Sequence, residues 1–189
     1  SRMKNSAGSP NSMSQTHRGP EPFSEPESKA FDRFVKEVGP VLSLNYHTSG
    51  GLILYGPGTY PDPPADAGLL EEIAEAYRDT QFDKYEAQPA IELYPTLGDL
   101  DDYLYHRYGI LAFTVEVGTG MMKRALVPRN GTWSPVFWAY NVYYLDREKA
   151  NNVPGALVMI EYAIKVHANP DIRKWQPSDD LWVNEPEKR

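Results

Sequence analysis

The sequence predicts an α/β fold, in which helices cover the faces of a sheet made of short, apolar strands. Segments with apolar residues three and four positions apart, typical of amphipathic helices, alternate along the chain with short runs that are almost entirely apolar. Such runs are typical of strands that are covered on both faces, which favours a sheet between layers of helices. With 189 residues, 41% of them hydrophobic, the chain can form one domain with a substantial core.

Composition excludes several classes of function. The net charge of −7 argues against a nucleic-acid partner or an anionic membrane surface. Every apolar run is far shorter than the roughly 20 residues that a membrane span needs, so we expect no membrane partner. No basic segment followed by an apolar run opens the chain, so a signal peptide is either already removed or never existed. The absence of cysteine excludes disulfides, thiolate metal ligands and a cysteine nucleophile.

Composition and the residues that start and stop helices predict the structure of the first 39 residues. Residues 1–23 are rich in Ser, Pro, Gly and Asn and predict an irregular segment. SEPESKAFDRFVKEVG (24–39) predicts a helix, with Pro26 in the first turn and Gly39 at the end.

The middle of the chain predicts two strands and a helix. Strands are expected at 41–47 and 51–55, separated by a Thr-Ser-Gly break and followed by a Pro-rich loop. GLLEEIAEAYRDTQF (68–82) predicts an amphipathic helix. Its expected buried stripe is Leu69, Ile73, Ala76 and Tyr77.

The second half predicts two further helices and a strand. GDLDDYLYHRYG (98–109) reads as a helix capped by Asp99 and ended by Gly109. ILAFTVEVG (110–118) predicts a buried strand. TWSPVFWAYNVYYL is expected to be irregular or a short helix, and VPGALVMIEYAIKVH (153–167) a helix with proline in its first turn, followed by a polar tail.

Two polar residues stand out at the ends of apolar strands. His47 closes the first strand, and a histidine in such a place is often only a hydrogen-bonded structural residue. Glu116 interrupts FTVEV, where it either projects into a cleft or faces water from an edge strand, because an unpaired buried carboxylate is costly. Taken one at a time, neither residue decides between a structural and a functional role.

Further candidates lie between these two strands. Tyr94 precedes a proline in a loop, and the acidic GDLDD stretch, which includes Asp101 and Asp102, is most simply a helix N-terminal cap. The other three histidines are expected in a loop (His17), on an exposed helix face (His106) and at a helix C-terminus (His167).

The order and spacing of these motifs resemble those of the zinc metallocarboxypeptidases of the carboxypeptidase A, B and T type. HTSGGLILYG corresponds to the family's metal-ligand histidine and the apolar strand after it, and FTVE to its "FTFE" strand. DDYLYHRYGILAFTVE is similar to the family's "DDW-Y---GI--FTFE" segment, and HRGPEPFSEPES to its "RGP-PFSEPET" segment. Tyr94 stands 22 residues before Glu116, which is the spacing of the corresponding tyrosine and glutamate in the family. The resemblance covers about residues 14–168.

The resemblance implies a mixed, mostly parallel sheet with helices on both faces, and a zinc-dependent peptidase that removes C-terminal residues from peptide substrates. It implies that His47 is a zinc ligand and that Glu116 is the general base toward a metal-activated water. Tyr94 would close over the substrate. Asp101, seven positions after Tyr94, would select basic C-terminal side chains, while Asp102 is the more structural of the two. A simple helix-cap role for Asp101 stays open. The resemblance also implies a secreted or periplasmic location.

The sequence departs from the family in one important respect. The family's other two zinc ligands form a His-x-x-Glu pair, and no histidine here is followed by glutamate at that spacing; the Asn-Arg pair for the substrate carboxylate occurs only reversed, as Arg129-Asn130. We therefore expect residues 24–168 to be the C-terminal half of a catalytic domain, between the irregular segment 1–23 and the tail 169–189, with the N-terminal half as a required partner. A peptidase of the same fold acting on peptidoglycan stem peptides and a non-catalytic binding module are the alternatives.

Overall fold

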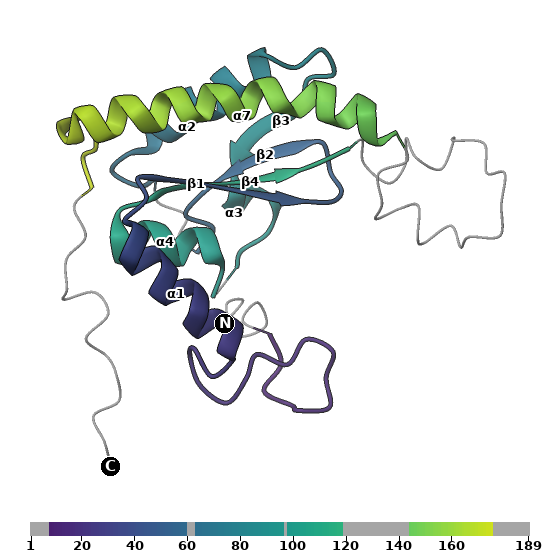
Figure 1. Cartoon of the computed structure of the whole chain (residues 1–189). Coiled ribbons are helices and arrows are strands. Elements are labelled where there is room, and N and C mark those ends of the chain that lie inside the picture. Colours follow the sequence, from purple (N-terminus) through teal and green to yellow (C-terminus); the bar gives the residue numbers. More distant parts are fainter. Residues whose placement is uncertain (1–7, 60–62, 97, 119–143, 176–189) are drawn as a thin grey trace, which may run out of the picture.

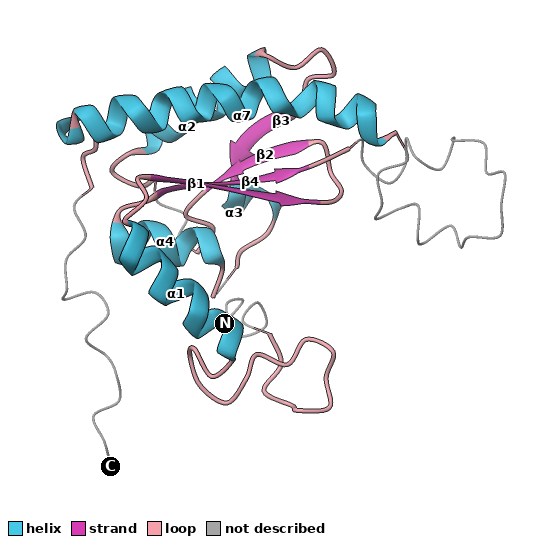
Figure 2. Ribbon diagram, in the orientation of Figure 1, coloured by secondary structure: helices cyan, strands magenta, loops and turns pink. Residues whose placement is uncertain are grey.

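A computed structural model describes residues 8–59, 63–96, 98–118 and 144–175. In this part of the chain, a four-stranded sheet lies between two layers of helices (Figures 1 and 2). The strands are β1 (Leu42–His47), β2 (Leu52–Tyr55), β3 (Glu86–Pro89) and β4 (Leu111–Glu116). The helices are α1 (Pro26–Val38), α2 (Ala67–Asp79), α3 (Ala90–Leu93), α4 (Leu100–Tyr108), α7 (Leu145–Ala168) and the 3₁₀ turn η2 (Pro170–Ile172).

The sheet has the order β1-β4-β2-β3. β1 pairs with β4 and β2 with β3 in parallel, whereas β2 and β4 are antiparallel, so the sheet is mixed with two parallel pairings of three. The three strands expected from the apolar runs therefore lie side by side, and the prediction of a mixed α/β sheet with helices on both faces is confirmed.

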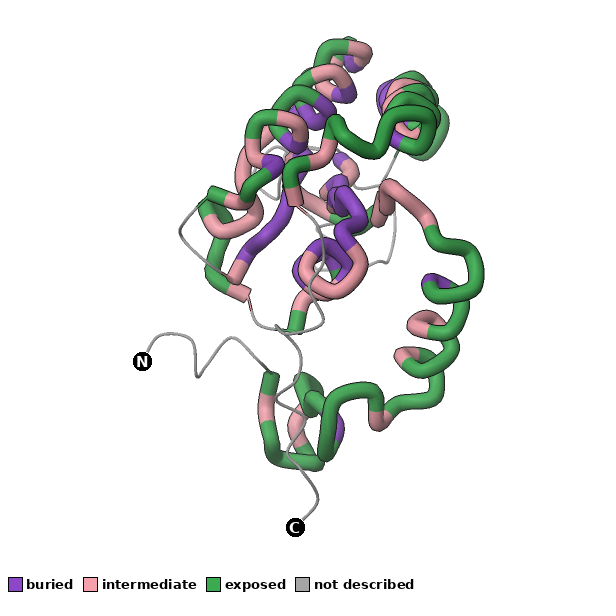
Figure 3. Tube along the Cα trace, turned by 90° about the vertical axis from the view of Figure 1, so that its left-hand side faces the viewer, coloured by how far each residue is buried: buried purple, intermediate pink, exposed green. Residues whose placement is uncertain are grey.

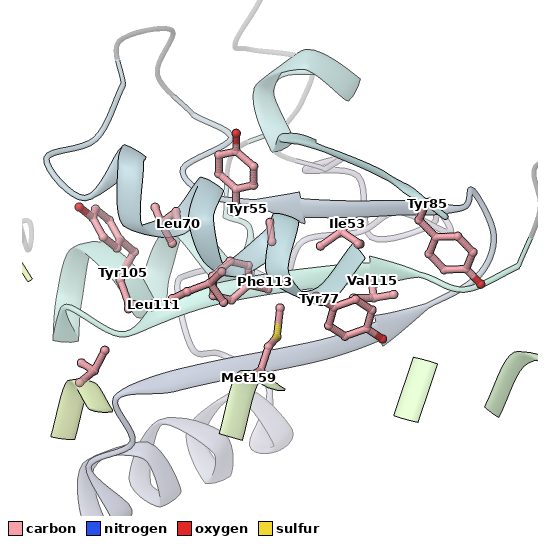
Figure 4. Packing of buried hydrophobic residues seen from close by; sticks show 13 residues of the cluster. Ile53, Tyr55, Leu70, Tyr77, Tyr85, Tyr105, Leu111, Phe113, Val115 and Met159 are labelled. Atoms are coloured by element: carbon pink, nitrogen blue, oxygen red, sulfur yellow. The ribbon is translucent and has the colours of Figure 1, made fainter. Parts of the chain in front are cut away.

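Alternation along the strands gives the sheet two different faces. α2 and α7 cover one face and α1 and α4 the other (Figure 1). The hydroxyls of Tyr46 and Tyr77 meet at 3.2 Å on the α2 side, whereas the amide of Asn45 donates to Asp101 of α4 at 2.7 Å on the opposite side. The larger core cluster lies between the sheet and α2 and α7, and Figure 4 shows Phe113 and Val115 of β4 beside Tyr77 of α2 and Met159 of α7.

The ends of α1 and α4 follow the predicted signals. α1 begins at Pro26 after Glu25 and ends at Gly39, which adopts the left-handed conformation that glycine accommodates without strain. α4 begins after Asp99, whose side chain accepts a hydrogen bond from the Asp101 amide, and ends at left-handed Gly109. α1 itself is exposed along most of its length (Figure 3), and Val35 is its one buried residue.

The structure corrects the prediction for the last helix. α7 begins at Leu145 rather than at 153, so Pro154 lies inside it instead of in its first turn. A proline there removes one backbone hydrogen bond from the helix. The preceding turn is held from outside, because the buried Asn151 side chain donates to the Asp83 carbonyl at 2.9 Å and accepts from its amide at 2.9 Å. The Trp/Tyr-rich stretch before α7 lies almost wholly outside the described residues.

Two smaller differences concern α2 and β3. The buried stripe of α2 is Leu70, Ile73, Ala74 and Tyr77. Leu69 and Ala76 are only partly buried, so half of the expected stripe was wrong. β3, followed directly by α3, was not anticipated. Among the helices of the described residues, none combines the length and apolar character required to cross a bilayer.

Candidate active site

His47 and Glu116 lie next to each other at the ends of neighbouring strands. The parallel register of β1 and β4 pairs the two residues directly. His47 Nδ1 is 3.9 Å from Glu116 Oε1, and the imidazole is 63% exposed while the glutamate side chain is 19% exposed. The structure thus brings together two residues 69 positions apart, an accessible imidazole and a mostly covered carboxylate.

The backbone around Glu116 is held on both sides. The Glu116 carbonyl accepts a hydrogen bond from the Gly51 amide at 2.7 Å, and the Val117 amide donates to the His47 carbonyl at 2.8 Å. Gly50 packs so closely that a Cβ added there would stand 3.1 Å from Glu116 Cβ. β4 is an interior strand of the sheet, so the interpretation of Glu116 as a water-facing residue of an edge strand is wrong.

Asp101 lies on the same face of the sheet as these two residues. It is only 4% exposed, and its carboxylate accepts hydrogen bonds from Asn45 Nδ2 and Thr114 Oγ1, each at 2.7 Å. Asn45 and Thr114 precede His47 and Glu116 by two positions, so strand alternation places all four side chains on one face. Burial raises the pKa of Asp101 to about 6, against the hydrogen bonds of its two neutral donors. A solvent-facing helix cap is therefore not what Asp101 forms.

Asp102 has a different and more local set of partners. Its side chain, 6% exposed, accepts from the Gly58 amide at 2.6 Å and from the Thr59 hydroxyl. These contacts tie α4 to the loop after β2. Burial also raises the pKa of Asp102 to about 6. The geometry is that of a residue that fixes a loop.

The remaining candidates lie outside the strands. Tyr94 follows α3 and is 60% exposed. His106 is not on an exposed face, because it is half-buried with its ring centroid 5.5 Å from that of Tyr105 and 6.1 Å from that of Trp175. Burial lowers the pKa of His106. His17 contacts the Ser9 carbonyl in the N-terminal segment.

His47 could supply one ligand of a zinc site, but the described residues around it do not supply a complete set of ligands. Catalytic zinc is held by three protein ligands and keeps a fourth position open. Across the ranges that the structure describes, no three His, Cys, Asp or Glu side chains come together in a group that could hold a metal. An exposed imidazole beside a carboxylate can complete a site whose other ligands come from elsewhere.

Three residues near the candidate site were not anticipated from the sequence. Asn45 and Thr114 escaped notice, although their signal is simple: each stands two positions before a candidate site residue on a strand. Tyr85, whose hydroxyl accepts from the Gly118 amide at 2.8 Å just beyond Glu116, also gave no sequence signal.

Comparison with known proteins identifies the family of the chain. The sequence profile of a family described as zinc carboxypeptidase matches residues 2–136, which include His47, Tyr94, Asp101 and Glu116. The chain belongs to the zinc carboxypeptidase family. A comparison with curated proteins found no match.

Several solved structures share the fold. The carboxypeptidase A of Helicoverpa armigera is 22% identical, with a TM-score of 0.67 over 87% of this chain and 40% of its own. Thrombin-activatable fibrinolysis inhibitor is 18% identical, with a TM-score of 0.66 over 84% of this chain and 38% of its own. The bovine inhibitor in complex with tick carboxypeptidase inhibitor has the same identity and TM-score over 84% of this chain and 52% of its own. The chain therefore spans about two-fifths to one-half of these structures.

The raised pKa of Asp101 generates a prediction for stability. Between the unfolded value near 4 and the folded value of about 6, the folded state binds more protons than the unfolded state, so the free energy of unfolding falls as pH rises through this window. Asp101→Asn removes the titrating carboxyl. The quantity to compare is the free energy of unfolding of the variant minus that of the wild type. We expect this difference to be about 2 kcal/mol larger at pH 7.5 than at pH 4.5.

Urea denaturation of both proteins at the two pH values measures this difference. Taking the variant relative to the wild type cancels the opposing titration of His106. A relative stability that does not change with pH would show that burial does not perturb Asp101.

Proposed function

We propose that this chain forms part of the active site of a zinc-dependent metallocarboxypeptidase, which hydrolyses the C-terminal residues of peptides. The observation that carries the proposal is the direct pairing of His47 with Glu116 at the ends of β1 and β4. Membership of the zinc carboxypeptidase family supports it.

In this proposal His47 offers a neutral imidazole nitrogen to zinc, as its exposure allows. Zinc in such a site polarises a carbonyl group and lowers the pKa of a bound water. Glu116 takes the proton of the attacking water on a carboxylate oxygen and passes it to the leaving amine. Its backbone, held by Gly51 and by the strand pairing with His47, keeps the carboxylate in place during both transfers. Tyr94, on an exposed loop, closes over the substrate.

We propose that the N-terminal half of the catalytic domain is the partner that supplies the remaining zinc ligands. Two features support docking beside β1. β1 is an edge strand of the described sheet, so its outer edge can pair with another strand. α7, which contacts β1, exposes apolar side chains at a spacing of four, three and four. They are Val153, Leu157, Ile160 and Ile164. We call this chain together with that partner the assembled domain.

Specificity for basic C-terminal side chains is the finer part of the proposal. Asp101 is buried on the face that carries His47 and Glu116, and its only described hydrogen-bond donors to the side chain are neutral. A buried carboxylate with neutral partners gains most from a cation, so a lysine or arginine side chain of the substrate would be favoured over an apolar one.

The second candidate function is a non-catalytic binding module. It is favoured by a specific observation, namely that no group of three potential metal ligands gathers within the described ranges. Zinc content and peptide hydrolysis of the assembled domain discriminate between the two functions.

We expect the wild-type assembled domain to bind zinc and to hydrolyse peptides. His47→Ala should abolish zinc binding, whereas Ala at His17, His106 or His167 should leave the stoichiometry unchanged. Glu116→Gln should keep fold and zinc but lower turnover by about 10²–10⁴-fold, because a general base is lost. Tyr94→Phe should be milder.

Metal analysis by mass spectrometry and single-turnover peptide assays provide these values. Full zinc occupancy in His47→Ala, or near-normal turnover in Glu116→Gln, contradicts the roles assigned here. A folded assembled domain with neither zinc nor turnover favours the binding module.

The specificity proposal predicts a preference for peptides that end in Arg over those that end in Leu or Glu. Asp101→Ile should reverse the ratio of kcat/KM for Arg and Leu substrates by about 100-fold or more, since the variant offers an apolar surface in place of the carboxylate. Asp99→Asn is the matched control, because asparagine also caps helices well and should leave the ratio unchanged. If the wild type prefers Leu, or Asp101→Ile keeps the wild-type ratio, Asp101 does not select the substrate.

A further inference from the structure

The hydroxyl of Tyr85 joins three separate parts of the chain just beyond Glu116. Tyr85 is 4% exposed and lies immediately before β3. Figure 4 shows it at one end of the core cluster, past Ile53 and Val115. Its hydroxyl donates to Glu148 Oε2 at 2.6 Å and accepts from the Gly118 amide at 2.8 Å and from Asn152 Nδ2 at 3.2 Å. A phenolic hydroxyl has one proton and two lone pairs, so its capacity is fully used.

The three partners of the Tyr85 hydroxyl belong to two parts of the chain, namely the segment just after β4, with Gly118, and helix α7, with Glu148 and Asn152. Glu148 and Asn152 stand one turn apart on α7, and the Asn152 side chain also donates to the Glu148 carbonyl at 2.8 Å. Asn152 Oδ1 accepts from the hydroxyl of Tyr77 and from the amide of Gln81, both at 3.0 Å. The hydroxyl of Tyr85 is therefore part of a network of hydrogen bonds that links the region of α2 to α7. Burial raises the pKa of Tyr85, so it keeps the proton that it donates.

The contact with Gly118 bears directly on Glu116. Gly118 follows the last residue of β4 by two positions and has a φ of 91°, so the backbone leaves the strand direction there. From Leu111 to Glu116 the strand is held by its neighbours, and at Val117 by the His47 carbonyl. The Gly118–Tyr85 hydrogen bond is the next restraint along the chain. The Glu116 side chain has one described charged neighbour, His47 at 3.9 Å, so its position depends mainly on this backbone.

We propose that Tyr85, held by Glu148, is a positioning residue that fixes the end of β4 and thereby the carboxylate of Glu116. Its catalytic consequence rests on the proposed function of Glu116 as general base, whereas its structural consequence does not. Displacement of a reacting group by about 1 Å can cost on the order of 100-fold in rate, so a single hydrogen bond at this place matters.

The first test uses the chain alone and needs no activity. Tyr85→Phe removes the hydroxyl and leaves the ring in the core. By NMR, the Gly118 amide should exchange with solvent about 10-fold faster, which corresponds to one lost hydrogen bond. Tyr162→Phe is the matched control, because Tyr162 of α7 also donates to a glutamate, Glu72 of α2 at 2.7 Å, away from the strand end. This control should not change exchange at Gly118.

The second test measures turnover in the assembled domain. Tyr85→Phe should lower kcat about 10-fold with KM within twofold, because Glu116 is displaced while the substrate contacts persist. Glu148→Ala should behave like Tyr85→Phe. Glu148→Gln keeps an oxygen that accepts from Tyr85 and should restore most of kcat. Tyr162→Phe should have wild-type kinetics.

The outcomes separate this inference from the proposed function. Unchanged Gly118 exchange in Tyr85→Phe overturns the inference whatever the enzyme does. The inference is also overturned if Tyr85→Phe speeds exchange at Gly118 but leaves kcat unchanged. It is likewise overturned if Glu148→Gln loses as much kcat as Glu148→Ala. If the wild-type assembled domain shows no turnover, the proposed function is wrong, and so is the catalytic part of the inference. The exchange experiment still decides whether Tyr85 holds the end of β4.

Discussion

The parallel pairing of β1 with β4 is the constraint on which the rest of the structure depends. Its register sets His47 opposite Glu116 and Asn45 opposite Thr114. Because side chains alternate between the two faces of a strand, a shift of one residue would turn one strand's polar residues into the apolar core. The core under α2 and α7, with Phe113 and Val115 fully buried, makes such a shift costly. Burial on one face thus determines the arrangement of polar groups on the other.

The polar face is stable because its buried carboxylates have partners. Asp101 is satisfied by Asn45 and Thr114, one from each of the two paired strands. Asp102 is satisfied by the loop after β2. A buried carboxylate without donors would cost several kcal/mol. The price of burial nonetheless shows in the raised pKa values of both residues.

Local signals predicted much of this fold, whereas long-range contacts decided the rest. Gly39, Asp99 and Gly109 mark helix ends through hydrogen bonds within a few residues, and the prediction was confirmed at all three. β3 has the sequence EAQP and forms by backbone pairing at the sheet edge, so it carries no apolar pattern. The start of α7 was predicted too late, because Pro154 signals the first turn of a helix. The turn before Pro154 is held by hydrogen bonds between Asn151 and Asp83, which lie far apart in the sequence.

The candidate site, too, was predictable from the sequence only in part. The sequence singled out His47 and Glu116, because polar residues at the ends of apolar strands are visible in a linear pattern. It could not establish that Asp101 rather than Asp99 is buried, since the GDLDD stretch offers three acids and only the packing of α4 on the sheet distinguishes them. Tyr85 could not be found at all, because its partners Gly118, Glu148 and Asn152 are 33 to 67 positions away.

The register of β1 and β4 can be measured directly as scalar couplings across hydrogen bonds by NMR of the deuterated chain. We expect a coupling between the Val117 amide nitrogen and the His47 carbonyl carbon, and another between the Gly51 amide nitrogen and the Glu116 carbonyl carbon. Coupling of Val117 to the carbonyl of residue 46 or 48 instead would place His47 and Glu116 on opposite faces of the sheet and contradict a shared site.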